Sequence, residues 1–264
     1  MDHPILYRKN LHSKELISSF LVLALLALAV IVVGEAKASR LTVTPDNSCF
    51  IPALYHDLLN RNPASGEVAS GQDYLASHTR AQYAATLLAG TEYRIDLIQG
   101  WYRRFLGRPA SNSDITFWLS YFGSGGTDEG VIANIVSSNE YFNLPRVGGT
   151  NSGYIIALYQ DLLGRSPSTT ELHSWLAAMG SGTTRLQVAQ NILSSDEYRT
   201  DLIQSWYQKY LRRSASVSEV NTWLSVFSSG GTDEQIIATI VGLDEYFNRA
   251  GICTVFLSLI MRER

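Results

Sequence analysis

The chain has 264 residues, of which 45% are hydrophobic and 17% are charged, and its formal net charge at pH 7 is −3. This composition is typical of a folded globular protein and argues against an intrinsically disordered chain. Lysine and arginine are scattered singly along the sequence and form no basic stripe. We therefore do not expect the chain to bind nucleic acid. The two cysteines, Cys49 and Cys253, are too few for a zinc ribbon, an iron–sulfur cluster or a cysteine-dense scaffold.

The first 38 residues have the pattern of an export signal. Three cations precede an apolar run over residues 20–33, and Ala36-Lys37-Ala38 follows it. This order is typical of a secretory signal peptide, for which we expect cleavage after Ala38. The alternative is an uncleaved single-pass membrane anchor over residues 16–33 with a cytoplasmic N-terminus, the only membrane contact we expect. Both interpretations place the rest of the chain outside the cytoplasm, either secreted or in the cell envelope.

The remaining sequence is an internal repeat. The motif Ala-Leu-Tyr-x-Asp-Leu-Leu-x-Arg starts at Ala53 and again at Ala157, and similar matches follow at a shift of 104 or 105 residues. Each half divides again, because an apolar pair, x-Arg and a later Glu-Tyr occur four times, with a period of about 50 residues. The repeated residues are Arg61, Arg108, Arg165 and Arg213, then Trp118, Trp175 and Trp223, with Tyr74 in the first repeat, and finally Glu92, Glu140, Glu197 and Glu245.

Each repeat has the pattern of helices. Apolar residues recur with helical spacing from Tyr93 to Leu106 and again from Tyr198 to Leu211, which predicts two long helices that each join one repeat to the next. Ser/Thr-x-x-Glu/Gln capping boxes predict further helix starts. They begin at Thr79, Ser137, Ser168, Thr184, Ser194, Ser216 and Thr232, and Thr127 keeps the cap although Gly130 lacks the partner side chain. No alternating run of strand type occurs between them.

We therefore predict an all-α fold of four tandem helical repeats, paired into two helical domains after the N-terminal signal or anchor helix. Pro145, Gly148 and Gly149 interrupt the chain where the second and third repeats meet. The predicted segments are 1–38 signal or anchor, 39–49 short linker, 50–144 first domain, 145–152 linker, 153–248 second domain and 249–264 apolar C-terminal tail. The tail is too short to span a membrane, and we expect it to dock on the last repeat or on a partner.

The third repeat resembles a known family. It contains Leu163-Gly164-Arg165, then Trp175 ten residues later, and then Ser-x-Glu-Tyr ending at Tyr198. These motifs resemble the bacterial domain-of-unknown-function family 4214, and the resemblance extends over about 200 residues. It implies tandem helical units in exported bacterial proteins, similar to phycobilisome linker-type domains, and it offers no catalytic residues to carry over. The first and fourth repeats depart most from the pattern.

Few residues of the sequence suggest a catalytic or binding site. The repeated arginines suggest either an anion site or, as we expect, bonds to helix-end carbonyls and to acids such as the glutamate of Glu-Tyr. The repeated tryptophans suggest core packing, with a sugar-stacking platform as the alternative. Asp128-Glu129 and Asp233-Glu234 follow helix caps, where the helix dipole favours acids. We expect no metal and no cofactor, because the histidines of the exported part occupy different repeat positions: His56, His78 and His173.

Cys49 and Cys253 flank the repeats. In an oxidising compartment they could form a disulfide, and a buried free thiol would suit the apolar surroundings of Cys253 equally well.

From these features we expect a non-enzymatic exported scaffold or adhesion module whose partner is a cell-envelope or extracellular protein or a glycan. The alternative is a carbohydrate-binding or hydrolase-accessory protein acting outside the cytoplasm. Tryptophans exposed in a row would favour the alternative, and tryptophans buried in every repeat would favour the scaffold.

Overall fold

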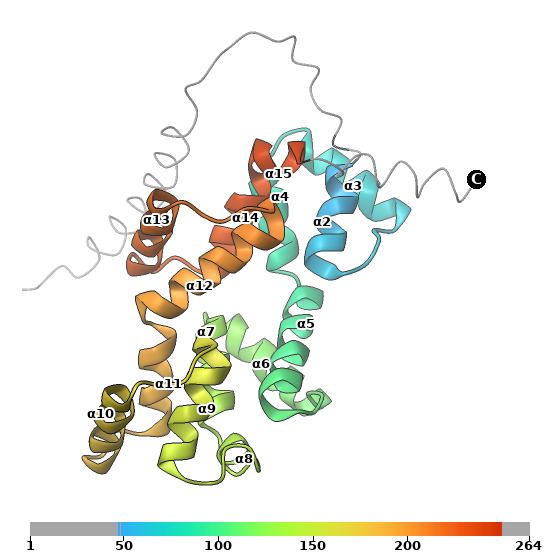
Figure 1. Ribbon diagram of the computed structural model, residues 1–264. Coiled ribbons are helices and arrows are strands. Elements are labelled where there is room, and N and C mark those ends of the chain that lie inside the picture. The colour runs from blue at the N-terminus through green and yellow to red at the C-terminus, as the bar shows by residue number, and fades with distance from the viewer. Residues whose placement is uncertain (1–46, 48, 250–264) are drawn as a thin grey trace, which may run out of the picture. The chain divides into compact units, whose positions relative to one another are not determined.

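The structure is a computed structural model that describes residue 47 and residues 49–249 (Figure 1). The predicted signal or anchor lies outside the described residues, as do most of the linker that follows it and all of the C-terminal tail beyond Arg249. Cys253 also lies outside them, so the disulfide and the signal cleavage stay predictions.

Every regular element in the described part of the chain is helical, as the sequence predicts. The first half contains α2 (Phe50–Leu59), α3 (Ser65–Leu75), α4 (Arg80–Leu88), α5 (Thr91–Trp101), the π-helical segment η1 (Tyr102–Leu106), α6 (Asn112–Gly123), α7 (Asp128–Ser137) and α8 (Asn139–Phe142). The second half contains α9 (Asn151–Leu163), α10 (Thr169–Gly180), α11 (Arg185–Leu193), α12 (Asp196–Trp206), the π-helical segment η2 (Tyr207–Leu211), α13 (Val217–Ser228), α14 (Asp233–Gly242) and α15 (Asp244–Asn248).

Several of these helices start with a side-chain cap at the predicted residue. The Thr79 hydroxyl accepts a hydrogen bond from the backbone N–H of Gln82, and the Gln82 side chain accepts one from the backbone N–H of Thr79. Such reciprocal bonds satisfy two N–H groups that a helix start otherwise leaves unpaired. The capping boxes predicted at Ser168, Thr184, Ser216 and Thr232 are also present.

Two predicted helix starts are wrong by one residue. The predicted caps are Ser137 and Ser194, and the observed caps are Ser138 and Ser195. Glu140 and Glu197 therefore occupy the second helical position, and not the third position from which a side chain reaches back to the cap. Their carboxylates bind arginines instead.

Two helices continue into wider turns. α5 runs into η1 and α12 runs into η2, so the two predicted long helices are present with a π-helical last turn that the sequence does not indicate. Both end on a left-handed residue, Gly107 with φ 70° and Arg212 with φ 60°. Glycine adopts this conformation without steric cost, whereas Arg212 does so at some cost in free energy.

The buried residues form two hydrophobic cores. The first combines residues 49–93 with residues 203–247, and the second is drawn from residues 98–193. In Figure 1, α4 accordingly packs against α14, and α7 packs against α11. The cores do not coincide with the predicted domains 50–144 and 153–248, because α5 and α12 each carry their two ends into different cores. The predicted linker contributes Val147, which is 2% exposed, to the second core.

Matching polar contacts join α8 to α9 and α15 to α2. The Tyr141 hydroxyl donates to the Asp161 carboxylate at 2.7 Å, and the Tyr246 hydroxyl donates to the Asp57 carboxylate at 2.9 Å. Each aspartate also pairs with an arginine, which is Arg146 in the first case and Arg249 in the second. Tyrosines 105 residues apart and aspartates 104 residues apart thus occupy matching places in the two halves.

Candidate functional site

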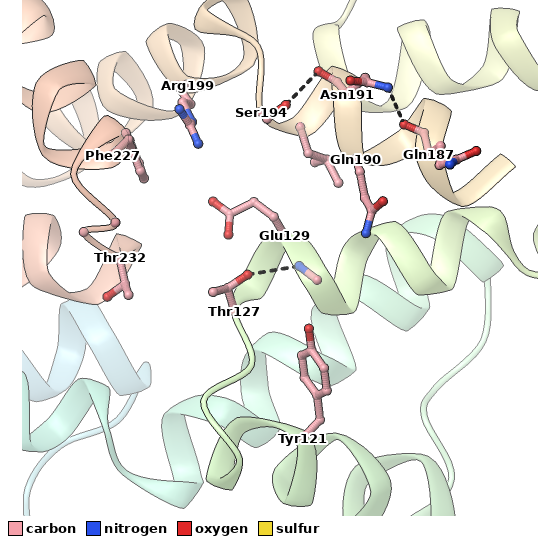
Figure 2. Close-up of a pocket in the computed structure, with 14 residues that line it drawn as sticks. Tyr121, Thr127, Glu129, Gln187, Gln190, Asn191, Ser194, Arg199, Phe227 and Thr232 are labelled. Carbon is pink, nitrogen blue, oxygen red and sulfur yellow. Dashed lines mark hydrogen bonds between the residues drawn. The ribbon is translucent and has the colours of Figure 1, made fainter. Parts of the chain in front are cut away.

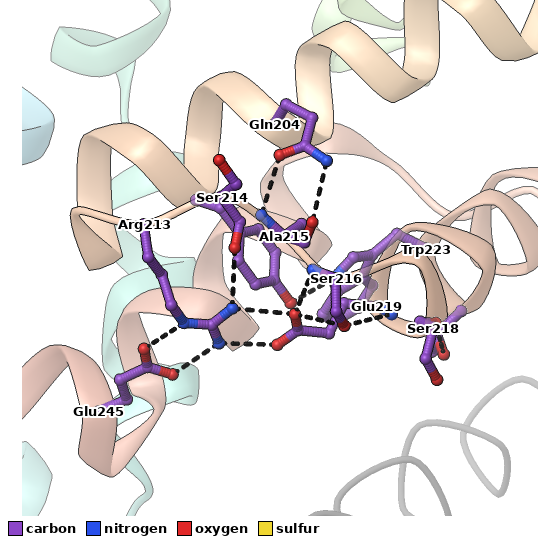
Figure 3. Close-up of polar contacts among 11 residues, drawn as sticks. Gln204, Arg213, Ser214, Ala215, Ser216, Ser218, Glu219, Trp223 and Glu245 are labelled. Atoms are coloured by element: carbon purple, nitrogen blue, oxygen red, sulfur yellow. Dashed lines mark hydrogen bonds and ion pairs between the residues drawn. The ribbon is translucent and has the colours of Figure 1, made fainter.

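Each repeated arginine is held between two carboxylates. Arg213 donates to Glu245 through Nε at 2.5 Å and Nη2 at 2.8 Å, and to Glu219 through Nη1 at 2.9 Å and Nη2 at 2.7 Å (Figure 3). Its remaining N–H donates to the Ser214 carbonyl at 3.1 Å. A guanidinium has five N–H donors, and all five are used here. The matching clusters are Arg61 with Glu67 and Glu92, Arg108 with Asp114 and Glu140, and Arg165 with Glu171 and Glu197.

These arginine clusters are structural and leave little capacity for an external anion. The Arg213 guanidinium also lies over the Tyr207 ring, 5.0 Å from its centroid, which adds a cation–π contact. Hydrogen bonds from Arg213 lower the pKa of Glu219 to about 2, and those from Arg165 do the same for Glu171. Both carboxylates are therefore charged at neutral pH, and the ion pair predicted with the Glu-Tyr glutamate is present at every repeated arginine.

A glutamine side chain makes two hydrogen bonds to the loop beside the cluster in Figure 3. The Gln204 side chain accepts from the backbone N–H of Ala215 at 2.9 Å and donates to its carbonyl at 3.0 Å. Gln99 makes the same two bonds to Ala110, both at 3.1 Å. The loop that follows each π-helical segment is thus tied to the helix before it.

The repeated tryptophans pack inward and bond to tyrosines. Trp223 Nε1 donates to the Tyr207 hydroxyl at 2.8 Å, and Trp118 Nε1 donates to the Tyr102 hydroxyl at 2.9 Å. Both indoles are 6% exposed. Trp175 is half-buried and makes the same bond to a tyrosine at 3.0 Å. Burial of this kind favours core packing over a sugar-stacking platform.

Two acids assigned from sequence to the helix dipole are buried. Asp128 and Asp233 begin α7 and α14, are each 8% exposed, and line one cavity of about 140 Å³ together with Tyr93 and Tyr198. Burial raises the pKa of both carboxyls well above the ordinary range, and neighbouring glutamates raise it further. Sequence spacing could have revealed this, since buried apolar residues follow each aspartate at the third and fourth positions, one helical turn along the same face.

A larger polar pocket lies where α7, α11 and α12 meet the turn between α13 and α14 (Figure 2). It has a volume of about 670 Å³. The side chains of Glu129 and Gln190 point into it from α7 and α11, and Arg199 and Tyr121 contribute a guanidinium and a phenol ring to its walls. The sequence pattern marks Glu129 only as a helix-dipole acid and gives no signal for Gln190, Arg199 or Tyr121.

Glycine residues make room for Tyr121. A Cβ atom on Gly130 would lie 2.1 Å from the Tyr121 hydroxyl oxygen, and one on Gly126 would lie 2.1 Å from the ring carbon Cε1. Gly130 is the position where the capping box lacks its Glu or Gln. Its missing side chain is therefore explained by the close approach of Tyr121, and Thr127 still caps α7 by accepting from the Gly130 N–H at 3.2 Å.

Within residue 47 and residues 49–249, no group of three or more His, Cys, Asp or Glu side chains is placed to hold a metal ion. No helix in the same part of the chain is long and apolar enough to cross a membrane. Cys49 is buried at the edge of the first core.

Comparison with known families identifies a segment in the middle of the chain. A search of curated proteins finds no relative of this chain. A family model described as a domain of unknown function (DUF4214) matches residues 146–202. The matched segment contains α9, α10 and α11, the first turns of α12 and the complete arginine cluster of Arg165. The resemblance drawn from the sequence is thus confirmed for this segment, which matches the DUF4214 family.

Proposed function

We propose that the chain is a non-enzymatic interaction module, a scaffold or adhesion protein built from four helical repeats, that acts outside the cytoplasm. The observation that carries this proposal is the cluster of arginine, two carboxylates and tyrosine that recurs four times. In each cluster the side chains bind one another, so we assign these residues to the stability of the fold. Ligand recognition is then left to residues that differ between the repeats.

The export part of the proposal rests on the pattern of residues 1–38 and is tested with a reporter fusion. Residues 1–46 are fused to a phosphatase that is active only after export. We expect activity outside the cytoplasm, and N-terminal sequencing of the full chain should find a product that starts at Ser39. Leu25→Arg with Leu26→Arg breaks the apolar run and should abolish export. Equal activity of this variant would contradict the proposal.

The interaction part is tested by retention of envelope material. The full chain, coupled to a resin, is incubated with solubilised envelope of its own host cell, with an unrelated helical protein at the same loading as the control. We expect saturable retention of a partner by the full chain alone. Digestion with a protease or oxidation with periodate before incubation then separates protein partners from glycans. Retention of no protein and no glycan would overturn the proposal.

The carbohydrate-binding alternative does not depend on the tryptophans. Trp118 and Trp223 lie in the cores at 6% exposure, so they offer no stacking surface. The polar pocket of Figure 2 is the feature that bears on a glycan ligand.

A further inference from the structure

We propose that the polar pocket of Figure 2 binds an uncharged carbohydrate unit, and that the exposed side chains of α11 recognise it. This inference rests on the proposed function, because it names the ligand class of a non-enzymatic interaction module. Three observations carry it: a matching place in the other half of the chain that lacks the same side chains, polar groups of the pocket that are held in fixed positions, and the balance of charge in the pocket.

Several residues that line the pocket have counterparts at matching positions in the other half of the chain. The Arg199 guanidinium lies 5.0 Å from the centroid of the Phe227 ring, and the Arg94 guanidinium lies 5.0 Å from the centroid of the Phe122 ring. These residues are 105 positions apart and belong to the two matching halves. Thr127 with Glu129 in α7, and Thr232 with Glu234 in α14, correspond in the same way.

Polar side chains line the pocket but are absent from the matching place in the other half of the chain. On α11 the pocket is lined by Gln190, Asn191 and Ser194, whereas the matching residues of α4 are Ala85, Thr86 and Ala89. Both helices are packed in the same way, α11 against α7 and α4 against α14. Alanine and threonine therefore suffice for packing at these places, so packing does not require the two amides and the hydroxyl that line the pocket.

Tyr121 and Gly130 also distinguish the pocket from the matching place in the other half. The matching residues in the other half are Val226 and Gln235. Replacing glutamine by glycine opens the space that the Tyr121 phenol occupies beside the pocket. An aromatic ring next to polar groups suits the apolar face of a sugar ring together with its hydroxyls.

The pocket offers donors and acceptors in fixed positions. Arg199 Nε and the matching Arg94 Nε are both buried without a hydrogen bond to any described residue, so this feature is common to both halves. Asn191 donates its amide N–H to the Gln187 carbonyl at 2.9 Å, which orients its side-chain oxygen, and Ser194 donates to the Asn191 carbonyl at 3.2 Å (Figure 2). The Gln190 amide can both donate and accept, as a sugar hydroxyl also does.

The charges in the pocket favour a neutral ligand. Glu129 and Arg199 are the charged residues among those that line it, and their formal charges cancel. A charged ligand would meet one of them with like sign. The volume of about 670 Å³ lies within the range of small-molecule sites, so one or more sugar units fit without opening of the fold.

The test uses the full chain and a triple variant, Gln190→Ala with Asn191→Thr and Ser194→Ala. These substitutions reproduce the residues that α4 carries, so the variant should fold and melt as the wild type does. The probes are glucose, galactose, mannose and N-acetylglucosamine with their linear oligosaccharides, measured by calorimetry and ligand-observed NMR. We expect at least one neutral probe to bind, and the triple variant to bind it at least about tenfold more weakly. Thr86→Ala on α4 is the matched control and should bind like the wild type.

Three results would overturn the inference: binding of no neutral probe, equal binding by the folded triple variant, or binding only of charged probes such as glucuronate or glucosamine. The resin experiment separates this failure from failure of the proposed function. A partner retained by the wild type in the absence of saccharide binding would refute the carbohydrate ligand alone. Loss of both would refute the interaction module as well.

Discussion

Asp128 and Asp233 start helices in different halves of the chain, and their carboxyl groups line the same small cavity. A helix N-terminus attracts negative charge, which favours an exposed acid at this position by about 0.3–1 kcal/mol. Both side chains are only 8% exposed, however, and each has one carboxyl oxygen without a hydrogen bond to the described residues. Burial of like charges that lack full hydrogen bonding costs more than the dipole returns.

We therefore expect Asp128→Asn to stabilise the protein at pH 7. Burial raises the pKa of Asp128, repulsion from Glu234 and Glu129 raises it further, and Arg94 partly opposes this. Asparagine keeps the shape and removes the charge. The melting temperature, measured by circular dichroism, should rise by a few degrees, since about 1 kcal/mol corresponds to about 2–4 °C in a chain of this size.

The pH dependence of this effect has a definite sign. Because the pKa is raised in the folded state, the penalty is absent below the ordinary aspartate pKa of about 4 and grows as the pH rises through the folded value. The advantage of Asp128→Asn should thus vanish near pH 4. Asp196→Asn is the matched control, because Asp196 also starts a helix, α12, but is exposed. A loss of stability in Asp128→Asn at pH 7 would show that the dipole dominates.

The tyrosine hydroxyls that accept from tryptophan should differ in their contribution to stability. Tyr207→Phe leaves the indole N–H of Trp223, which is 6% exposed, without its acceptor. An unsatisfied buried donor costs about 1–3 kcal/mol. Tyr159→Phe removes the same bond from Trp175, which is half-buried and can turn to water, so the loss should be smaller. Urea unfolding measures both variants, and equal losses would contradict the role of burial.

Replacing a repeated arginine by lysine should weaken the fold in an acid-dependent way. In Arg165→Lys, one ammonium group cannot make the paired bonds that Arg165 makes to both Glu171 and Glu197. All three side chains are about one-third exposed or more, so solvent screening limits the expected loss to about 1 kcal/mol at pH 7. Urea unfolding at several pH values gives the measurement.

The arginine bonds lower the pKa of Glu171 to about 2. Their contribution is therefore complete above the ordinary glutamate pKa and is lost as the pH falls towards 2. The difference between wild type and Arg165→Lys should shrink over that interval. Arg103→Lys, at an exposed arginine on η1, serves as the control and should change little at any pH.

Local sequence patterns predict the helices well but cannot choose between adjacent equivalent residues. A capping box identifies a helix start because its bonds lie within four residues. Where two serines are adjacent, at positions 194 and 195, either hydroxyl could cap, and the observed choice of Ser195 places Glu197 towards Arg165. That arginine is 32 residues away, so the deciding contact is not local.

The pairing of helices and the polar pocket depend on contacts over even longer distances. Helical periodicity marks one apolar face on α4 and one on α14 but does not say which faces meet. The contact of Arg80 with Asp244 joins residues 164 positions apart. The pocket combines Tyr121, Gln190 and Phe227 from three separate helices, α6, α11 and α13, and the local sequence around each gives no sign of a shared site.

Two glycines should respond to alanine in opposite directions. A Cβ atom on Gly153, in the first turn of α9, would lie 1.9 Å from the Val147 carbonyl oxygen, a backbone atom that cannot rotate away. Gly153→Ala must therefore displace the chain that enters α9 and should destabilise the protein by about 1–3 kcal/mol.

Gly100, near the end of α5, has no neighbouring atom within 4 Å of the position of a Cβ. Gly100→Ala should stabilise the protein by about 0.5–1 kcal/mol, because alanine loses less backbone entropy in a helix. Urea unfolding of the two variants under the same conditions tests the contrast. If Gly153→Ala were as stable as the wild type, the close approach of Val147 to α9 would have to be relaxed in solution. The turn that joins α8 to α9 would then be looser than its geometry indicates.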